Sequence, residues 1–210
     1  MKPVVHIVDD DESYRTATAR LLSAHGHRVE VHESGDQFLA HLPACGPGCV
    51  LLDLQMPGQS GLQIQRRLCE LAPLLPVVFL TGEGDIKASV EAMKAGAKDF
   101  LEKSSTTAAL MEAIDRALIQ YERQRAEYDR LQAHRALVAR LSPREGEVFR
   151  FLIRGHLNKQ IAHALGISER TVKVHRHQVM EKLGVRSLAE AVSIAANIGL
   201  IDQDTGSPVE

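Results

Sequence analysis

The sequence lacks an apolar segment long enough to cross a bilayer, because its longest apolar run, residues 74–80, is short and contains Pro76. Residues 1–3 lead directly into an apolar strand pattern, without the hydrophobic stretch and cleavage site of a secretory signal peptide. We therefore expect a cytoplasmic protein with no membrane-spanning segment and no membrane partner.

Cysteine is also scarce, and Cys45, Cys49 and Cys69 form an odd set without the second pair that a four-cysteine zinc site needs. Cys45 and Cys49 enclose Gly-Pro-Gly, so a redox or metal role for this pair stays open. Reduced thiols in a cytosolic protein are the simpler interpretation, and we adopt it.

No extreme of composition points to disorder or a fibrous repeat, because 44% of the residues are hydrophobic and 25% are charged. A length of 210 residues suits two compact domains joined by a linker. The net charge is only −2, but residues 1–103 carry 10 basic and 14 acidic side chains, whereas residues 142–200 carry 9 and 5. An acidic first domain followed by a basic second one indicates that only the second binds a polyanion.

Short apolar segments alternate with amphipathic ones over the first half of the chain. Several of the apolar segments are β-branched runs without polar alternation, as in strands buried on both faces of a parallel sheet. Strands are predicted at residues 4–8, 28–31, 49–52, 77–80 and 99–101, and helices at residues 14–25, 35–42, 62–71 and 86–95, with another beginning near Thr106. This alternation predicts a doubly wound α/β domain with a five-stranded parallel sheet over residues 1–118.

Glycine and proline are absent from residues 106–140, where apolar or bulky side chains recur every three or four positions. We predict that the last helix of the first domain runs on into a helical linker at residues 119–140. Gln124 and Arg135 interrupt the apolar stripe, which favours a solvated single helix, although a coiled coil stays open.

Residues 141–200 are predicted to form an all-α domain of four helices, followed by a disordered tail at residues 201–210. Ser142, Pro143 and Glu145 form a capping box with proline in the first turn. Asn158 and Ser168 are candidate caps of the next two helices. The four helices are expected at about residues 143–154, 158–165, 168–183 and 188–197. A short helix, a glycine-containing turn and a longer helix make the helix-turn-helix layout.

Polar side chains follow the predicted strands of the first domain, at the edge where ligands bind in doubly wound sheets. They are Asp9, Asp10, Asp53, Thr81 and Lys103. Three converging carboxylates repel one another unless a divalent cation lies among them, and oxygen ligands suit Mg²⁺. A lysine and a threonine opposite can hold phosphoryl oxygens, so one carboxylate can act as a nucleophile toward phosphorus.

The segments at residues 5–11, 53–58, 81–82 and 99–103 resemble the receiver domain of FixJ-type response regulators of two-component systems. The resemblance spans residues 1–120 and implies that Asp53 is the phosphoacceptor. The implied Mg²⁺ ligands are Asp10, Asp53 and the backbone carbonyl of Gln55, with Asp9 contributing through water. The implied phosphoryl-contacting and switch residues are Thr81, Lys103 and Phe100. Arg15 then falls at the family spacing from the acidic pair.

One residue departs from the family pattern, because Ser104 stands where proline, reached through a cis peptide bond, usually follows the active-site lysine. A cis bond before a non-proline residue costs about 3–4 kcal/mol. Either the bond is trans or the pocket forces it. A DNA-binding regulator that works without phosphorylation therefore stays open as an alternative.

Five segments of the second domain resemble the LuxR/NarL-type DNA-binding domain: residues 141–145, 158–162, 165–168, 171–175 and 182–185. On the helix at residues 168–183, one side carries the stripe Val172, His175, Val179 and Leu183, which is expected to face the core. His175 is therefore interpreted as a partly buried residue and not as a base reader.

The opposite side of the same helix carries the side chains that are expected to meet DNA. Lys173 can donate to guanine acceptors, and Val174 offers an apolar surface to a thymine methyl group. The predicted base contacts are Lys173, Val174 and His177. The predicted phosphate contacts are Asn158, Lys159, Arg170, Thr171, Arg176 and Lys182.

The resemblance also implies partners: a sensor histidine kinase, promoter DNA and RNA polymerase. Activation would form a homodimer through a face that carries Val90, Lys94 and Asp99, placing two recognition helices on successive half-sites. Release of the DNA-binding domain from an inhibitory contact is equally compatible. We expect that the protein is not an enzyme. The rival interpretation is a phosphatase with an aspartyl nucleophile, but in such phosphatases the nucleophile usually follows the first strand, whereas Asp53 follows the third.

Overall fold

The computed structural model describes residues 2–42, 46–82, 90, 93–94 and 96–201. The chain divides into two compact units, Met1–Ala126 and Glu127–Glu210, and each unit is described by itself. Cys49 is a buried free thiol and Cys69 an exposed one, while Cys45 lies outside the described residues.

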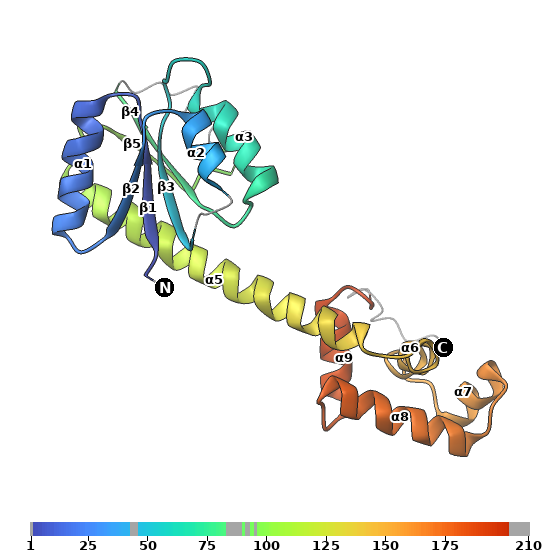
Figure 1. Ribbon diagram of the computed structural model, residues 1–210. Helices are drawn as coiled ribbons and strands as arrows, with labels where there is room; N and C mark the ends of the chain where they lie inside the picture. Colours follow the sequence, from blue (N-terminus) through green and yellow to red (C-terminus); the bar gives the residue numbers. More distant parts are fainter. Residues whose placement is uncertain (1, 43–45, 83–89, 91–92, 95, 202–210) are drawn as a thin grey trace. The chain divides into compact units, whose positions relative to one another are not determined.

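A five-stranded parallel sheet forms the centre of the first unit (Figure 1). Its strands are β1 (Val4–Val8), β2 (Arg28–His32), β3 (Gly48–Asp53), β4 (Val77–Thr81) and β5 (Asp99–Glu102). They lie in the order β2-β1-β3-β4-β5, and every neighbouring pair is parallel. The predicted doubly wound fold is confirmed, and each predicted strand is within one residue of the observed one.

Helices cover both faces of this sheet (Figure 1). Helix α1 (Glu12–Ala24) and the first half of α5 (Thr107–Ala139) pack on one face through a core that includes Leu22 and Ile114. Helices α2 (Gly35–His41) and α3 (Gly61–Leu71) pack on the other face through Phe38 and Ile64. Strands β1, β3 and β4 are therefore buried at every position, as their mostly apolar sequences predict.

The helix predicted at residues 86–95 lies mostly outside the described residues. Of the face proposed for dimerisation, Val90 and Lys94 are helical and exposed. Asp99 begins β5 and forms an ion pair with Arg116 of α5. The tail beyond residue 201 also lies outside the described residues.

Helix α5 contains 33 residues and runs from the first unit into the second, as the lack of glycine and proline predicts. All five of its buried residues lie in its first half, ending at Tyr121. The apolar first half therefore belongs to the core of the sheet domain.

The second unit contains the four expected helices, α6 (Pro143–Leu152), α7 (Asn158–Leu165), α8 (Glu169–Leu183) and α9 (Leu188–Asn197), around one core. The capping box before α6 is confirmed, since the backbone N–H of Ser142 donates to Glu145 Oε2 at 2.7 Å. The prediction that Asn158 caps α7 is wrong. Leu157 is the cap residue, and its N–H donates to Gln160 Oε1 at 2.8 Å, so Asn158 is already helical.

Candidate functional site

The polar residues predicted at the strand ends do converge at one edge of the sheet. Asp9 and Asp53 are 0% and 4% exposed, Thr81 is 1% exposed, and Asp10 faces solvent. Carboxylate oxygens of the three aspartates lie within 4.8 Å of one another. The order of the strands explains this convergence, because β1 and β3 are direct neighbours at the point where the strand order reverses.

Lys103 joins two of these carboxylates from the end of β5. Its Nζ lies 2.8 Å from Asp9 Oδ2 and 3.0 Å from Asp53 Oδ2, and the Tyr14 ring lies beneath it. The backbone N–H of Lys103 donates to the carbonyl of Thr81 at 2.7 Å. The peptide bond between Lys103 and Ser104 is trans. The serine therefore does not keep the lysine away from the acidic residues.

The pocket holds three carboxylates against one ammonium group, and burial and charge shift the pKa values of Asp53 and Lys103. Burial raises the pKa of Asp53, and the charge of Asp9 adds to this, although Lys103 opposes it. Burial alone would lower the pKa of Lys103, but its contacts with Asp9 and Asp53 outweigh that effect and raise it. Lys103 is therefore a permanent cation at neutral pH.

The donor set of the pocket fits a hard divalent cation. All three candidate ligand side chains are carboxylates, which is the chemistry that Mg²⁺ prefers. Asp9 Oδ2 is buried and forms an ion pair with Lys103 at 2.8 Å, although the two groups are not aligned as a hydrogen bond. Three carboxylates around one ammonium group leave the pocket net negative, so it can accommodate a cation between Asp10 and Asp53.

Backbone contacts hold the two buried aspartates in place. The N–H of Asp11 donates to Asp9 Oδ1 at 2.9 Å, and Arg15 Nη1 donates to the Asp9 carbonyl at 2.6 Å. The N–H of Gln55 donates to Asp53 Oδ1 at 3.2 Å. A Cβ atom on Gly61 would lie 2.3 Å from the carbonyl oxygen of Asp53, so only glycine fits there. Sequence reasoning missed Gly61 and Tyr14, because neither belongs to a polar strand end.

Phe100 lies apart from the acidic residues. Its ring is half-buried, lies 6.3 Å from the ring of Phe79 and packs on the core beneath α2 and α3. Thr81 follows two residues after Phe79 on β4, and its carbonyl binds the backbone of Lys103. The candidate switch residues are thus linked through β4 and β5 to the pocket.

In the second unit, α8 separates its buried and exposed sides as predicted. Val172, Val179 and Leu183 are buried, and His175 is partly buried. Lys173 and His177 are exposed, and Val174 is 51% exposed, which is high for a valine. The predicted base-reading residues therefore share one accessible side of the helix.

The six predicted phosphate contacts differ in their surroundings. Lys159 and Arg170 are exposed, while Thr171 Oγ1 is hydrogen-bonded to Ser168 Oγ at 2.8 Å. Arg176 donates to Asn158 Oδ1 at 2.7 Å, which ties α8 to the start of α7. Lys182 donates to the buried Glu145 at 2.6 Å.

The sequence matches two family descriptions. Residues 5–115 match the response regulator receiver domain, and residues 139–195 match the bacterial regulatory proteins of the luxR family. The chain is 40% identical over 195 residues to the response regulator protein TodT of Pseudomonas putida, covering 93% of this chain and 86% of TodT. It is 42% identical over 191 residues to the transcriptional regulatory protein FixJ of Rhizobium meliloti, covering 91% and 94%.

Solved structures show the same kinship. The response regulator StyR matches with a TM-score of 0.84 and 43% identity, over 93% of this chain and 99% of StyR. Full-length FixJ from B. japonicum matches with a TM-score of 0.59 and 38% identity, over 96% and 100%.

The chain therefore belongs to the response regulators that combine a receiver domain with a LuxR-type DNA-binding domain. It is a transcription factor of the FixJ and TodT type. None of the helices in the described part of the chain could span a membrane.

Proposed function

We propose that Asp53 accepts a phosphoryl group from a sensor histidine kinase and that this modification controls the binding of promoter DNA by α8. The observation that carries the proposal is the position of Lys103, whose ammonium group contacts both Asp9 and Asp53 at the buried edge of the sheet. Such a cation next to a carboxylate suits the transfer of an anionic group to that carboxylate.

In the proposed step, a carboxylate oxygen of Asp53 forms a bond to phosphorus while the P–N bond of the phosphohistidine breaks. The electron pair of that bond returns to the imidazole of the kinase, and an acyl phosphate is left on Asp53. Lys103, 3.0 Å from Asp53 Oδ2, is placed to donate to the incoming phosphoryl oxygens. Asp10, Asp53 and the Gln55 carbonyl, with Asp9 through water, would hold Mg²⁺, whose chemistry when bound is neutralisation of the phosphoryl charge.

The phosphoryl group then shifts the population of receiver conformations through Thr81 and Phe100. A ligand favours one state only by its differential affinity for that state. Thr81 is buried beside the pocket, and Phe100 lies on the neighbouring strand, so a contact from Thr81 to the phosphoryl group can be followed by movement of the Phe100 ring. We expect this change to promote a homodimer and, through it, contact with RNA polymerase at the promoter.

The DNA-binding part of the proposal assigns base contacts to Lys173, Val174 and His177. The phosphate contacts proposed are Asn158, Lys159, Arg170, Thr171, Arg176 and Lys182. The proposed domain limits are residues 1–118, 119–140 and 141–200, supported by the end of the buried stretch of α5 at Tyr121 and by the cap at Ser142.

The experiment compares wild type with Asp53→Asn, each with and without beryllofluoride in excess Mg²⁺. DNA affinity is measured on a duplex selected from a random pool by the full chain, and oligomeric state by light scattering. We expect beryllofluoride to tighten DNA binding about tenfold, or about 1.4 kcal/mol, and to raise the mass in wild type only. Tight, donor-independent binding by both proteins would overturn control by phosphorylation and favour the alternative raised by Ser104.

A further inference from the structure

A second polar cluster lies beneath α2, away from the acidic pocket. It consists of His6 on β1, Glu30 and His32 on β2, and His41 on α2. His6 lies opposite Glu30 in the strand register, and His32 is two residues further along β2, so the three side chains share one face of the sheet. A histidine at the centre of the otherwise apolar strand β1 is the sequence signal for this cluster.

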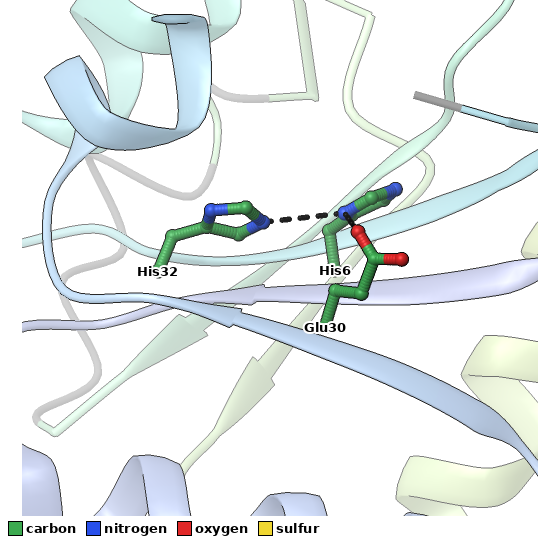
Figure 2. A group of neighbouring side chains, drawn as sticks. All are labelled: His6, Glu30 and His32. Carbon is green, nitrogen blue, oxygen red and sulfur yellow. Dashed lines mark hydrogen bonds and ion pairs between the residues drawn. The ribbon is translucent and has the colours of Figure 1, made fainter. Parts of the chain in front are cut away.

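The ligand-type atoms of this cluster converge on one point (Figure 2). His6 Nδ1 lies 3.3 Å from His32 Nε2 and 3.8 Å from Glu30 Oε2, and the three residues bring one ligand atom each within 4.8 Å of the others. His41 Nε2 lies 3.0 Å from the same Glu30 oxygen.

One nitrogen of the buried His6 ring is not satisfied by the protein groups that the structure describes. His6 is 0% exposed, and its Nε2 has no hydrogen-bond partner in the described part of the chain. Its Nδ1 faces His32 Nε2, and two facing ring nitrogens form a hydrogen bond only if one carries a proton and the other does not. Burial lowers the pKa of both rings, to about 4 for His32.

The cluster is open to solvent on one side. A shallow cavity of about 500 Å³ is lined by Glu30, His32, Gln37 and His41 among others. An ion can therefore reach the partly exposed Glu30 from this side, while His32 and His6 lie behind it and are 5% and 0% exposed. The acidic pocket shares no residue with this cluster.

We propose that His6, Glu30 and His32 form a binding site for Zn²⁺, with His41 positioning Glu30 and the solvent side left for a water ligand. Two imidazoles and a carboxylate are a usual zinc donor set. Ligand atoms about 2.0–2.1 Å from a tetrahedral ion are about 3.3 Å apart, which is the separation of the two ring nitrogens here. Nitrogen ligands also make the site a poor one for Mg²⁺, which prefers oxygen.

His41 would not bind the metal itself but would hold the ligand Glu30 in place, as the residues behind the ligands do around many metal ions. Its hydrogen bond to Glu30 fixes the carboxylate orientation, and loss of such a partner commonly weakens metal binding about 10–100-fold. Replacement of a direct ligand is expected to cost more than replacement of His41. This ranking separates a built site from scattered binding by surface histidines.

The test measures Zn²⁺ binding by isothermal titration calorimetry on the full chain, freed of metal with a chelator and kept in excess Mg²⁺ so that the acidic pocket cannot compete. We expect one tightly bound Zn²⁺ per chain, and Co²⁺ should show the visible absorption of a four-coordinate ion. Glu30→Gln and His32→Gln should each lower the affinity by more than about 100-fold, and His41→Gln by about 10–100-fold.

His25→Gln is the matched control, because His25 is an exposed histidine of the same unit and lies outside the cluster. It should bind Zn²⁺ like wild type. The proposal is overturned if wild type binds no Zn²⁺, or if Glu30→Gln binds as tightly as wild type. If far-UV circular dichroism shows that His32→Gln does not fold, Glu30→Gln decides the question, since Glu30 is 30% exposed and its replacement keeps the side-chain shape.

Discussion

At the scale of single residues, two buried carboxylates share one ammonium group at the end of the sheet. Lys103 reaches both Asp9 and Asp53 although Ser104 follows it in place of the proline usual in this family. The contact between the Lys103 N–H and the Thr81 carbonyl continues the β4–β5 ladder up to the lysine. The placement of the lysine thus depends on strand pairing, which the serine leaves intact.

Gly61 packs against Asp53, the proposed phosphoacceptor, in a way that a substitution can test. Alanine at this position would press on the Asp53 carbonyl, the Phe79 ring and the backbone of Leu54, none of which can easily move. We predict that Gly61→Ala lowers the free energy of unfolding by about 1–3 kcal/mol and slows phosphorylation of Asp53. Urea denaturation and the rate of labelling by a small phosphoryl donor measure the two effects.

Gly146 provides the control for that substitution. It lies within α6, and a Cβ atom there would meet nothing within 4 Å. Gly146→Ala should therefore raise stability by up to about 1 kcal/mol, because alanine is the better helix former. If Gly61→Ala and wild type had equal stability and equal labelling, the start of α3 would be able to move and make room for the methyl group. Gly61 would then not hold Asp53 in position.

At the scale of elements, Glu145 links the start of α6 to the end of α8. Its carboxylate accepts hydrogen bonds from Lys182 and from the Ser142 N–H, and these two contacts, the lysine first, lower the pKa of Glu145. A carboxyl group whose pKa is lower in the folded state stabilises the fold above its unfolded pKa. This contribution disappears as the pH falls below about 4.5 and through the folded-state value.

Glu145→Gln isolates that contribution, because glutamine still caps Ser142 but carries no charge. We predict that the variant is about 1 kcal/mol less stable than wild type at pH 7, a modest value because Lys182 is partly exposed. The difference should shrink toward zero as the pH is lowered below 4.5. Urea denaturation of both proteins between pH 7 and pH 3 provides the measurement, and a difference that does not change with pH would contradict the role of the charge.

The elements themselves were largely predictable, because their signals are local. Mostly apolar runs indicated β1, β3 and β4, and the capping box at Ser142 indicated the start of α6. Helix α1 begins at Glu12, two residues before the predicted start, since the side chain of Asp11 accepts the N–H groups of Ser13 and Tyr14. In a run of three aspartates, composition does not distinguish the capping residue from the two pocket residues.

The acidic pocket could be predicted from the sequence, whereas the histidine cluster could not. Strand ends of a parallel sheet meet at a known edge, so Asp9 and Asp53 could be brought together without coordinates. His6, His32 and His41 come from the middle of a strand, the end of another and a short helix. Only the register of β1 against β2 and the packing of α2 on the sheet bring them together.

At the scale of the whole molecule, the two domains differ in net charge and are expected to bind different partners. The first domain is acidic and brings Asp9, Asp10 and Asp53 together at one edge of its sheet, and the second presents basic groups on α7 and α8. Binding of DNA by the second domain should depend steeply on salt, because each phosphate contact releases counterions. Arg170 is expected to contribute more to this salt dependence than Lys182, because Arg170 is exposed while Lys182 is already paired with Glu145.

We predict that Arg170→Ala reduces the slope of log affinity against log salt by about 0.9, the value for one phosphate contact on duplex DNA. Lys173→Ala should instead weaken binding to the selected duplex by about 1–3 kcal/mol and relax its sequence preference, because the proposed base contact would be lost. Lys182→Ala should change the slope less than Arg170→Ala, since Glu145 neutralises Lys182 in the free protein. Fluorescence anisotropy across a salt series measures all three. If Lys182→Ala reduced the slope by the same amount as Arg170→Ala, Lys182 would leave Glu145 and contact a DNA phosphate in the complex. The link between α6 and α8 would then open on binding.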